Sequence, residues 1–189
     1  MTDRLLKVST NLLTPADPLD RPKNRLPVSL FVTEKESDGM SASEAMDEAT
    51  RREWRELGFY YEKDDQAKHW RFVGSRAGLM KFHGALLAYV ADERNSQDSE
   101  HEHYGPYMYL EVMTWPEAGA DGHSIHGTID DLRRLAGLIG ERLASTLPGD
   151  RFVIGPEYSP SAEYSMHFEV MEDGFDPVVA DTYLSTTAE

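Results

Sequence analysis

The sequence predicts an α+β domain, with a largely antiparallel sheet and about three helices packed on one face of it. Three segments carry apolar residues at the helical period behind a capping residue. Short segments between them alternate apolar and polar residues, as strands with one buried face do. The 189 residues suit one domain, and neither an internal repeat nor a flexible linker is visible. We therefore expect a single domain over residues 1–189, in which residues 1–25 form a turn-rich N-terminal extension.

The expected helices begin at residues that cap helices well. Ser41 and Thr128 are each followed three positions later by an acidic residue, which completes a capping box. Ser75 follows a glycine and precedes an apolar stripe. The helices are expected from Ser41 to Gly58, from Ser75 to about Asn95, and from Thr128 to the Pro148-Gly149 pair.

The strands follow from the alternation and from the turn residues at their ends. We expect strands at residues 26–33, 59–62, 69–73, 107–115, 152–154 and 164–171, a short strand or turn at 123–127, a charged loop at 95–103 and a turn-rich return after Gly174. In the segment 107–115, the residues at even positions form the core face. Tyr107, Tyr109 and Glu111 should therefore point away from the core.

The composition restricts the chemistry and the partners of the chain. Cysteine is absent, so disulfides, thiolate metal sites and cysteine nucleophiles are excluded. The formal net charge of -15 makes nucleic acid and anionic membranes poor partners, because both attract basic surfaces. No apolar run approaches the roughly 18 residues of a membrane span, and no signal-type segment opens the chain. We therefore expect a cytoplasmic protein that binds neither nucleic acid nor membrane.

Charge placement is a clearer functional signal than any catalytic motif. The chain has no G-x-S-x-G elbow, no G-x-G-x-x-G and no P-loop, so we expect no catalytic residue and no cofactor. Residues 92–126 and residues 151–189 instead hold eight acidic residues and one basic residue each. Clustered charge of one sign favours association with a surface of the opposite sign. We therefore expect a basic partner.

Four histidines offer a different interpretation, a metal site. The candidate ligands are His101, His103, His123 and His126. The first two lie two positions apart, so on an extended chain both point to one side. The other two could join them if the segments pair, with a carboxylate from Glu111 or Asp121. This alternative is a metal-dependent hydrolase, which needs a third ligand and an open coordination position.

Four segments together carry a resemblance to a known family. They read LGFYY at 57–61, WRFVGSRAGL at 70–79, EHEHYGPYMYL at 100–110 and GTIDDLRRLA at 127–136. They resemble small bacterial immunity proteins, which are encoded beside polymorphic or contact-dependent toxins. The resemblance covers roughly residues 57–145. It implies a non-enzymatic protein that binds a toxin domain and blocks its active site or substrate path.

An acidic inhibitor suits a toxin that is basic where it binds nucleic acid. We therefore expect an immunity or inhibitory protein that neutralises a cognate, basic toxin through an acidic, aromatic-centred surface. The expected anchors are Glu100, Glu102, Tyr107, Tyr109, Glu111 and Trp115, with Glu157 and Glu163 at the rim. A third alternative is a structural or regulatory domain whose acidity serves only solubility.

Overall fold

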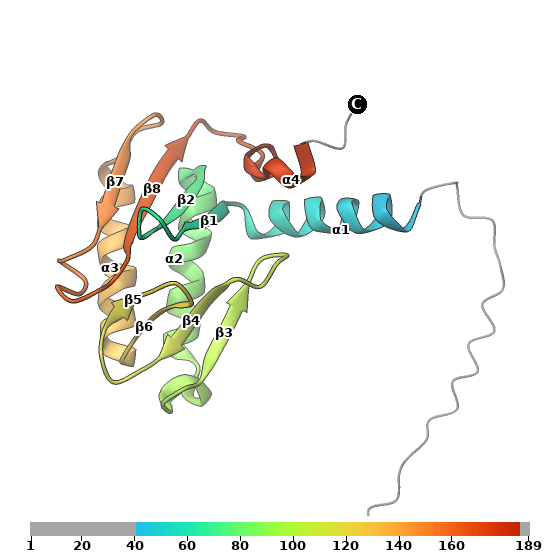
Figure 1. The fold of residues 1–189 in the computed structure, drawn as a ribbon. Coiled ribbons are helices and arrows are strands. Elements are labelled where there is room, and N and C mark those ends of the chain that lie inside the picture. Colours follow the sequence, from blue (N-terminus) through green and yellow to red (C-terminus); the bar gives the residue numbers. More distant parts are fainter. Residues whose placement is uncertain (1–40, 186–189) are drawn as a thin grey trace, which may run out of the picture. The chain divides into compact units, whose positions relative to one another are not determined.

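The computed structural model describes residues 41–185, whose strands form two four-stranded sheets. The strands are β1 (Tyr60–Asp64), β2 (His69–Ser75), β3 (His101–Tyr104), β4 (Leu110–Thr114), β5 (Gly119–Ala120), β6 (Ser124–Gly127), β7 (Arg151–Ile154) and β8 (Ser165–Met171). The helices are α1 (Ala42–Leu57), α2 (Arg76–Ala91), α3 (Ile129–Ser145) and α4 (Thr182–Ser185), with 3-10 turns η1 (Glu93–Ser96) and η2 (Pro177–Ala180). All of these elements lie in one of the two units into which the chain divides, residues 40–189. The expected α+β class is confirmed (Figure 1). The extension expected at 1–25 and the strand expected at 26–33 lie outside the described residues.

Both sheets have the same connectivity. Their strand orders are β1-β2-β8-β7 and β3-β4-β6-β5, and in each sheet two antiparallel pairs meet along a parallel centre. The chain order β1-β2-α2-β3-β4 therefore recurs as β5-β6-α3-β7-β8. Each of these two repeats contributes one pair of strands to each sheet. No repeat is visible in the sequence because the two repeats share pairing rather than residues. The expected, largely antiparallel pairing is confirmed, but the strands form two sheets rather than one, since alternation within a strand does not encode its partner.

The helix starts lie where the capping residues predict them. Ser41 and Thr128 each form a capping box, and Ser75 accepts a hydrogen bond from the amide of Gly78 at 3.1 Å. These caps satisfy amides that no helical carbonyl can reach. The α1 helix ends at a left-handed Gly58, as expected.

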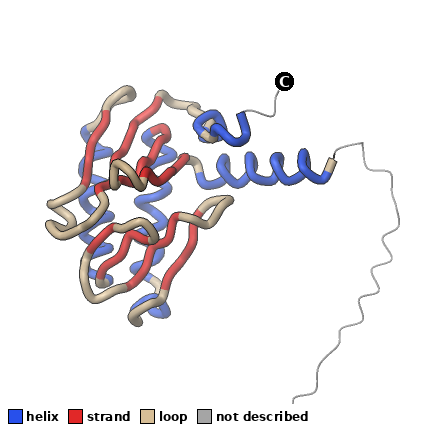
Figure 2. Tube along the Cα trace, in the orientation of Figure 1, coloured by secondary structure: helices blue, strands red, loops and turns tan. Residues whose placement is uncertain are grey.

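Helices α2 and α3 pack against each other and cover one face of the sheets (Figure 2). An aromatic stack joins helix to sheet: Phe72 lies 4.8 Å, between ring centroids, from both Phe82 and Phe168. Phe152 continues the stack at 4.7 Å from Phe168. Burial of these rings contributes to holding the helix pair on the sheets.

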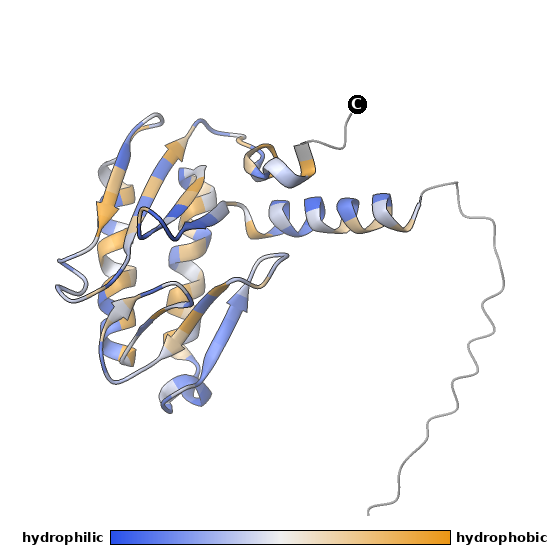
Figure 3. Ribbon diagram, in the orientation of Figure 1, coloured by the Kyte–Doolittle hydropathy of each residue, from blue (hydrophilic) through white to orange (hydrophobic). Residues whose placement is uncertain are grey.

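The structure adds elements that alternation did not predict. Strand β3 lies within the expected charged loop, and η2 and α4 lie in the expected turn-rich tail. Figure 3 shows β3 as hydrophilic, which explains why no apolar pattern marked it. Strand β4 begins only at Leu110, so Tyr107 and Tyr109 belong to the loop before it. No helix within residues 41–185 is long and apolar enough to cross a bilayer.

Candidate functional site

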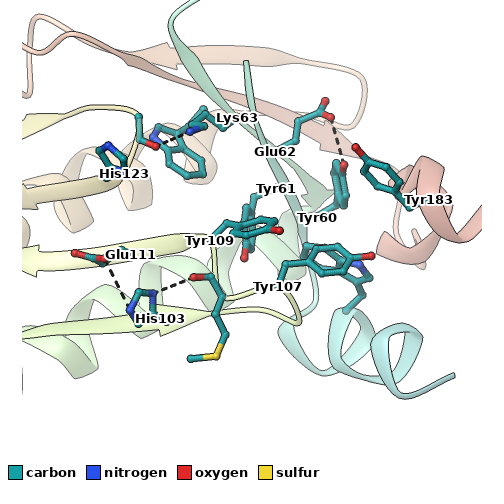
Figure 4. Close-up of a pocket in the computed structure, with 14 residues that line it drawn as sticks. Tyr60, Tyr61, Glu62, Lys63, His103, Tyr107, Tyr109, Glu111, His123 and Tyr183 are labelled. Atoms are coloured by element: carbon teal, nitrogen blue, oxygen red, sulfur yellow. Dashed lines mark hydrogen bonds and ion pairs between the residues drawn. The ribbon is translucent and has the colours of Figure 1, made fainter. Parts of the chain in front are cut away.

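A cleft of about 510 Å³ is bordered by both sheets. Strands β1 and β2 contribute to one wall, and β3, β4 and the loop between them contribute to the other. The cleft also reaches α1 and α4. Figure 4 shows its two ends: tyrosines gather beside α4, while histidines and Glu111 lie at the other end. The lining residues are Trp54, Tyr60, Tyr61, Glu62, Lys63, Trp70, His103, Tyr107, Met108, Tyr109, Glu111, Gly122, His123 and Tyr183.

The aromatic end is built around one buried carboxylate. The side chain of Asp181 accepts hydrogen bonds from Trp54 Nε1 and from the Tyr107 hydroxyl, both at 2.8 Å. Asp181 is fully buried. Trp54 packs on Tyr60 and Tyr107, with ring centroids 5.1 and 5.8 Å away. Burial, followed by the charge of Asp181, raises the pKa of Tyr107, so this phenol stays neutral and donates. The rings therefore have fixed positions before any ligand binds.

The loop before β4 carries the most exposed aromatic residue of that wall. Tyr61 donates from its hydroxyl to the carbonyl of Tyr104 at 2.5 Å, and the ring packs where a side chain at Gly105 would stand. Gly105 has a φ of 81°, a conformation that glycine adopts at little cost. Beyond it, Tyr109 stacks on Tyr107 and remains 70% exposed. The turn therefore presents Tyr109 to solvent at the cleft.

The polar end brings imidazoles and carboxylates together. His103 and Glu111 are direct partners in the β3–β4 pairing, so their side chains share a face. His101, His103 and Glu111 could together hold a metal ion. Lys63 lies at this end, where its ammonium bonds to the Gly122 carbonyl at 2.6 Å. This end therefore offers donors of the kind that bind metals.

The structure assembles three of the expected anchors at the cleft. Tyr107, Tyr109 and Glu111 all line it. Glu102 is on the opposite face of β3 from the two histidines, where its carboxylate accepts hydrogen bonds from Asn95 and Tyr104. Those bonds give Glu102 an internal role. Only part of the expected anchor set therefore forms one surface.

The other expected anchors lie elsewhere. Glu100 precedes β3 and Trp115 follows β4, and neither lines the cleft. Glu157 lies in the loop after β7, where its carboxylate is 3.7 Å from Arg142 of α3. Glu163 forms an ion pair with Lys68 at 2.8 Å beside a second, smaller pocket. The smaller pocket shares Lys63, Gly122 and His123 with the cleft, so Glu163 lies beside the polar end, whereas Glu100 and Glu157 line neither pocket.

The four histidines do not converge on one site. His123 lines the cleft but is not in the metal-capable group, and neither is His126. His126 instead lies 3.0 Å, through Nδ1, from the hydroxyl of Ser124 on its own strand. Of the expected set, the geometry joins His101 and His103, with Glu111 as the carboxylate.

Several residues that line the cleft were not predicted from the sequence. Trp54 and Tyr60 look like ordinary core residues, and Tyr183 belongs to the expected turn-rich tail. The role of Asp181 was not predicted, because it depends on partners from α1 and from the loop before β4. An acid within an apolar stretch, as in VVADTYL at 178–184, is the one local indication of a buried carboxylate.

Comparisons with models of protein families, with curated proteins and with solved structures find no match for this chain. The resemblance to immunity proteins therefore stays an expectation from the four short segments at 57–61, 70–79, 100–110 and 127–136.

Proposed function

We propose that this chain is a non-enzymatic immunity or inhibitory protein whose cleft binds a cognate, basic toxin. The observation that carries the proposal is the combination of fixed rings inside the cleft and exposed apolar side chains at its border. Met108, Tyr109 and Tyr183 are 59%, 70% and 83% exposed and all line the cleft. Apolar side chains grouped at a cleft are typical of a protein-binding surface.

Rigid aromatic residues are effective anchors because they bury much area with little loss of side-chain entropy. Tyr107 is held by Asp181, and Tyr109 stacks on Tyr107 with ring centroids 5.8 Å apart. A partner side chain that packs against these stacked rings would find its binding surface already formed. Preorganisation of this kind lowers the entropic cost of association.

Charge supports a cationic group at the aromatic end. The negative charge of Asp181 contributes to raising the pKa of both Tyr60 and Tyr107, after the larger effect of burial. A lysine or arginine side chain of the partner would be attracted by the same field and by the faces of the rings. The net charge of -15 would also accelerate encounter with a basic protein.

Binding to the product of the neighbouring gene tests the proposal. The full chain is titrated calorimetrically with that product, and with an unrelated basic protein, at about 0.15 M salt. We expect tight, saturable binding to the former only. Tyr109→Ala and Tyr183→Ala should each weaken it about tenfold or more.

Leu147→Ala is the matched control, because Leu147 is a large apolar residue that is 64% exposed and does not line the cleft. Its affinity should equal that of the unmodified chain. The proposal fails if the neighbouring product binds no tighter than the unrelated basic protein. It also fails if the two cleft variants bind as Leu147→Ala does.

A further inference from the structure

Three side chains of strands β3 and β4, two of which line the polar end of the cleft, form a compact group of potential metal ligands. His101 and His103 project from the same face of β3, and Glu111 lies beside them on β4, paired with His103. One ligand atom from each residue can be chosen so that all lie within 4.8 Å of one another. The strand register therefore places all three residues on one face.

Both imidazoles are oriented by the backbone. Nδ1 of His101 lies 3.0 Å from the carbonyl oxygen of Ser99, and Nδ1 of His103 lies 2.9 Å from that of Met108. A carbonyl oxygen can only accept, so Nδ1 carries the hydrogen in both bonds. In the neutral ring, Nε2 then keeps its lone pair. Metal-binding histidines show this arrangement, in which a hydrogen bond at one nitrogen fixes the ring and the tautomer.

From these contacts we infer that His101, His103 and Glu111 bind a divalent transition-metal ion of the zinc class. Nε2 of His103 and Oε2 of Glu111 are 3.8 Å apart. Ligand atoms bonded to one ion at about 2.1 Å stand about 3 to 3.6 Å apart, so a small side-chain rotation brings this pair to the required spacing. The ligand atom of His101, which lies within 4.8 Å of the other two, must move closer as well. Two imidazoles and a carboxylate favour zinc, cobalt or iron over calcium and magnesium, which prefer oxygen ligands.

The ion would keep coordination positions for further ligands. His103 and Glu111 line the cleft, so these positions face the space that a bound molecule would occupy. A carboxylate or imidazole of a bound molecule can occupy them in place of water. The site lies away from the tyrosines beside α4 (Figure 4), and its metal binding does not depend on the proposed toxin partner.

Direct metal titration of the full chain tests the inference. Chelator-stripped protein is titrated with Co²⁺, followed by visible absorption, and with Zn²⁺ by calorimetry, in the absence of any partner. We expect one equivalent of either ion to bind. The affinity should fall with falling pH, because protons compete with the metal ion for its ligands.

Variants assign the ligands. His101→Ala, His103→Ala and Glu111→Gln should each weaken Zn²⁺ binding about tenfold or more. His123→Ala is the control, because His123 lines the same cleft outside the group, and it should bind as the unmodified chain does. Circular dichroism confirms that each variant is folded. The inference is overturned if the unmodified chain binds less than one equivalent, or if His103→Ala and Glu111→Gln both retain its affinity.

Discussion

The hydroxyl of Tyr107 donates a hydrogen bond to the buried carboxylate of Asp181 at 2.8 Å. The bond joins the loop before β4 to the segment between η2 and α4, which is distant in the sequence. Trp54 donates to the same carboxylate oxygen, so α1 also belongs to the network. The aromatic end of the cleft therefore has its shape because three separate parts of the chain share one carboxylate.

Removal of the Tyr107 hydroxyl should destabilise the fold. Tyr107→Phe leaves the buried carboxylate of Asp181 without one of its donors, and we expect the free energy of unfolding to fall by about 1 to 3 kcal/mol. Urea denaturation followed by circular dichroism measures the change. Tyr109→Phe is the control, because Tyr109 is mostly exposed, and it should alter the free energy of unfolding by less than about 0.5 kcal/mol. Equal effects of the two variants would show that the bond to Asp181 adds no stability.

Two glycines with similar backbone angles should respond differently to alanine. Gly105 and Gly149 have φ values of 81° and 89°, so alanine at either position costs about 1 to 2 kcal/mol of backbone strain. A Cβ at Gly105 would also lie 2.7 Å from the Tyr61 ring, whereas a Cβ at Gly149 meets no atom within 4 Å. We expect Gly105→Ala to lower the melting temperature more than Gly149→Ala does. Equal melting temperatures would contradict the close packing of Tyr61 on the turn.

Protonation of His167 should destabilise the protein at mildly acid pH. Its ring stacks on His69 at 4.4 Å, and Nε2 lies 2.9 Å from the hydroxyl of Ser165. Partial burial, with a smaller contribution from His69, holds the pKa of His167 below its ordinary value of 6.5, although Glu169 acts in the opposite direction. The unfolded chain therefore binds more protons between the two pKa values. Stability from this group is complete above pH 6.5 and is lost as the pH falls through the lower, folded-state pKa.

His167→Gln tests this directly, because it removes the titrating group and keeps a polar side chain. The free energy of unfolding, measured between about pH 7.5 and pH 5.5, should depend less on pH in the variant. His123→Gln, at an exposed position, should keep the original pH dependence. If the free energy of unfolding of His167→Gln depends on pH as strongly as that of the unmodified chain, the prediction is wrong.

The cap of α3 should contribute measurable stability. Thr128 and Asp131 exchange hydrogen bonds at 3.2 Å, each side chain accepting from the amide of the other residue. Thr128→Ala should lower the free energy of unfolding by about 1 kcal/mol, since an amide of the first turn loses its partner. Thr128→Ser restores a hydroxyl and should stay close to the unmodified chain. A serine variant as unstable as the alanine variant would exclude the cap as the cause.

Part of the candidate site could be predicted from the sequence. Glu111 lies on the face of β4 away from the core, as the alternation predicted, and lines the cleft. Tyr107 and Tyr109 line it from the loop before β4, where strand alternation does not apply, and Met108, expected on the core face, is 59% exposed. The spacing of His101 and His103 anticipated a shared face, although their strand was expected to be a loop. Residues on one strand are predictable in this way because their relative directions are local. The positions of Glu157 and Glu163 could not be predicted in this way, because each lies in a loop whose position depends on the tertiary structure.

The sequence by itself determined the α+β class, the three long helices and their starts at Ser41, Ser75 and Thr128, because caps and periodicity act within a few residues. Tertiary structure alone decided the division into two sheets and the pairing of β3 with β4 that brings Glu111 to the histidines. It also decided the meeting of Trp54, Tyr107 and Asp181. Such contacts join residues far apart in the chain, and the free energy that selects them comes from burial and pairing across the whole fold.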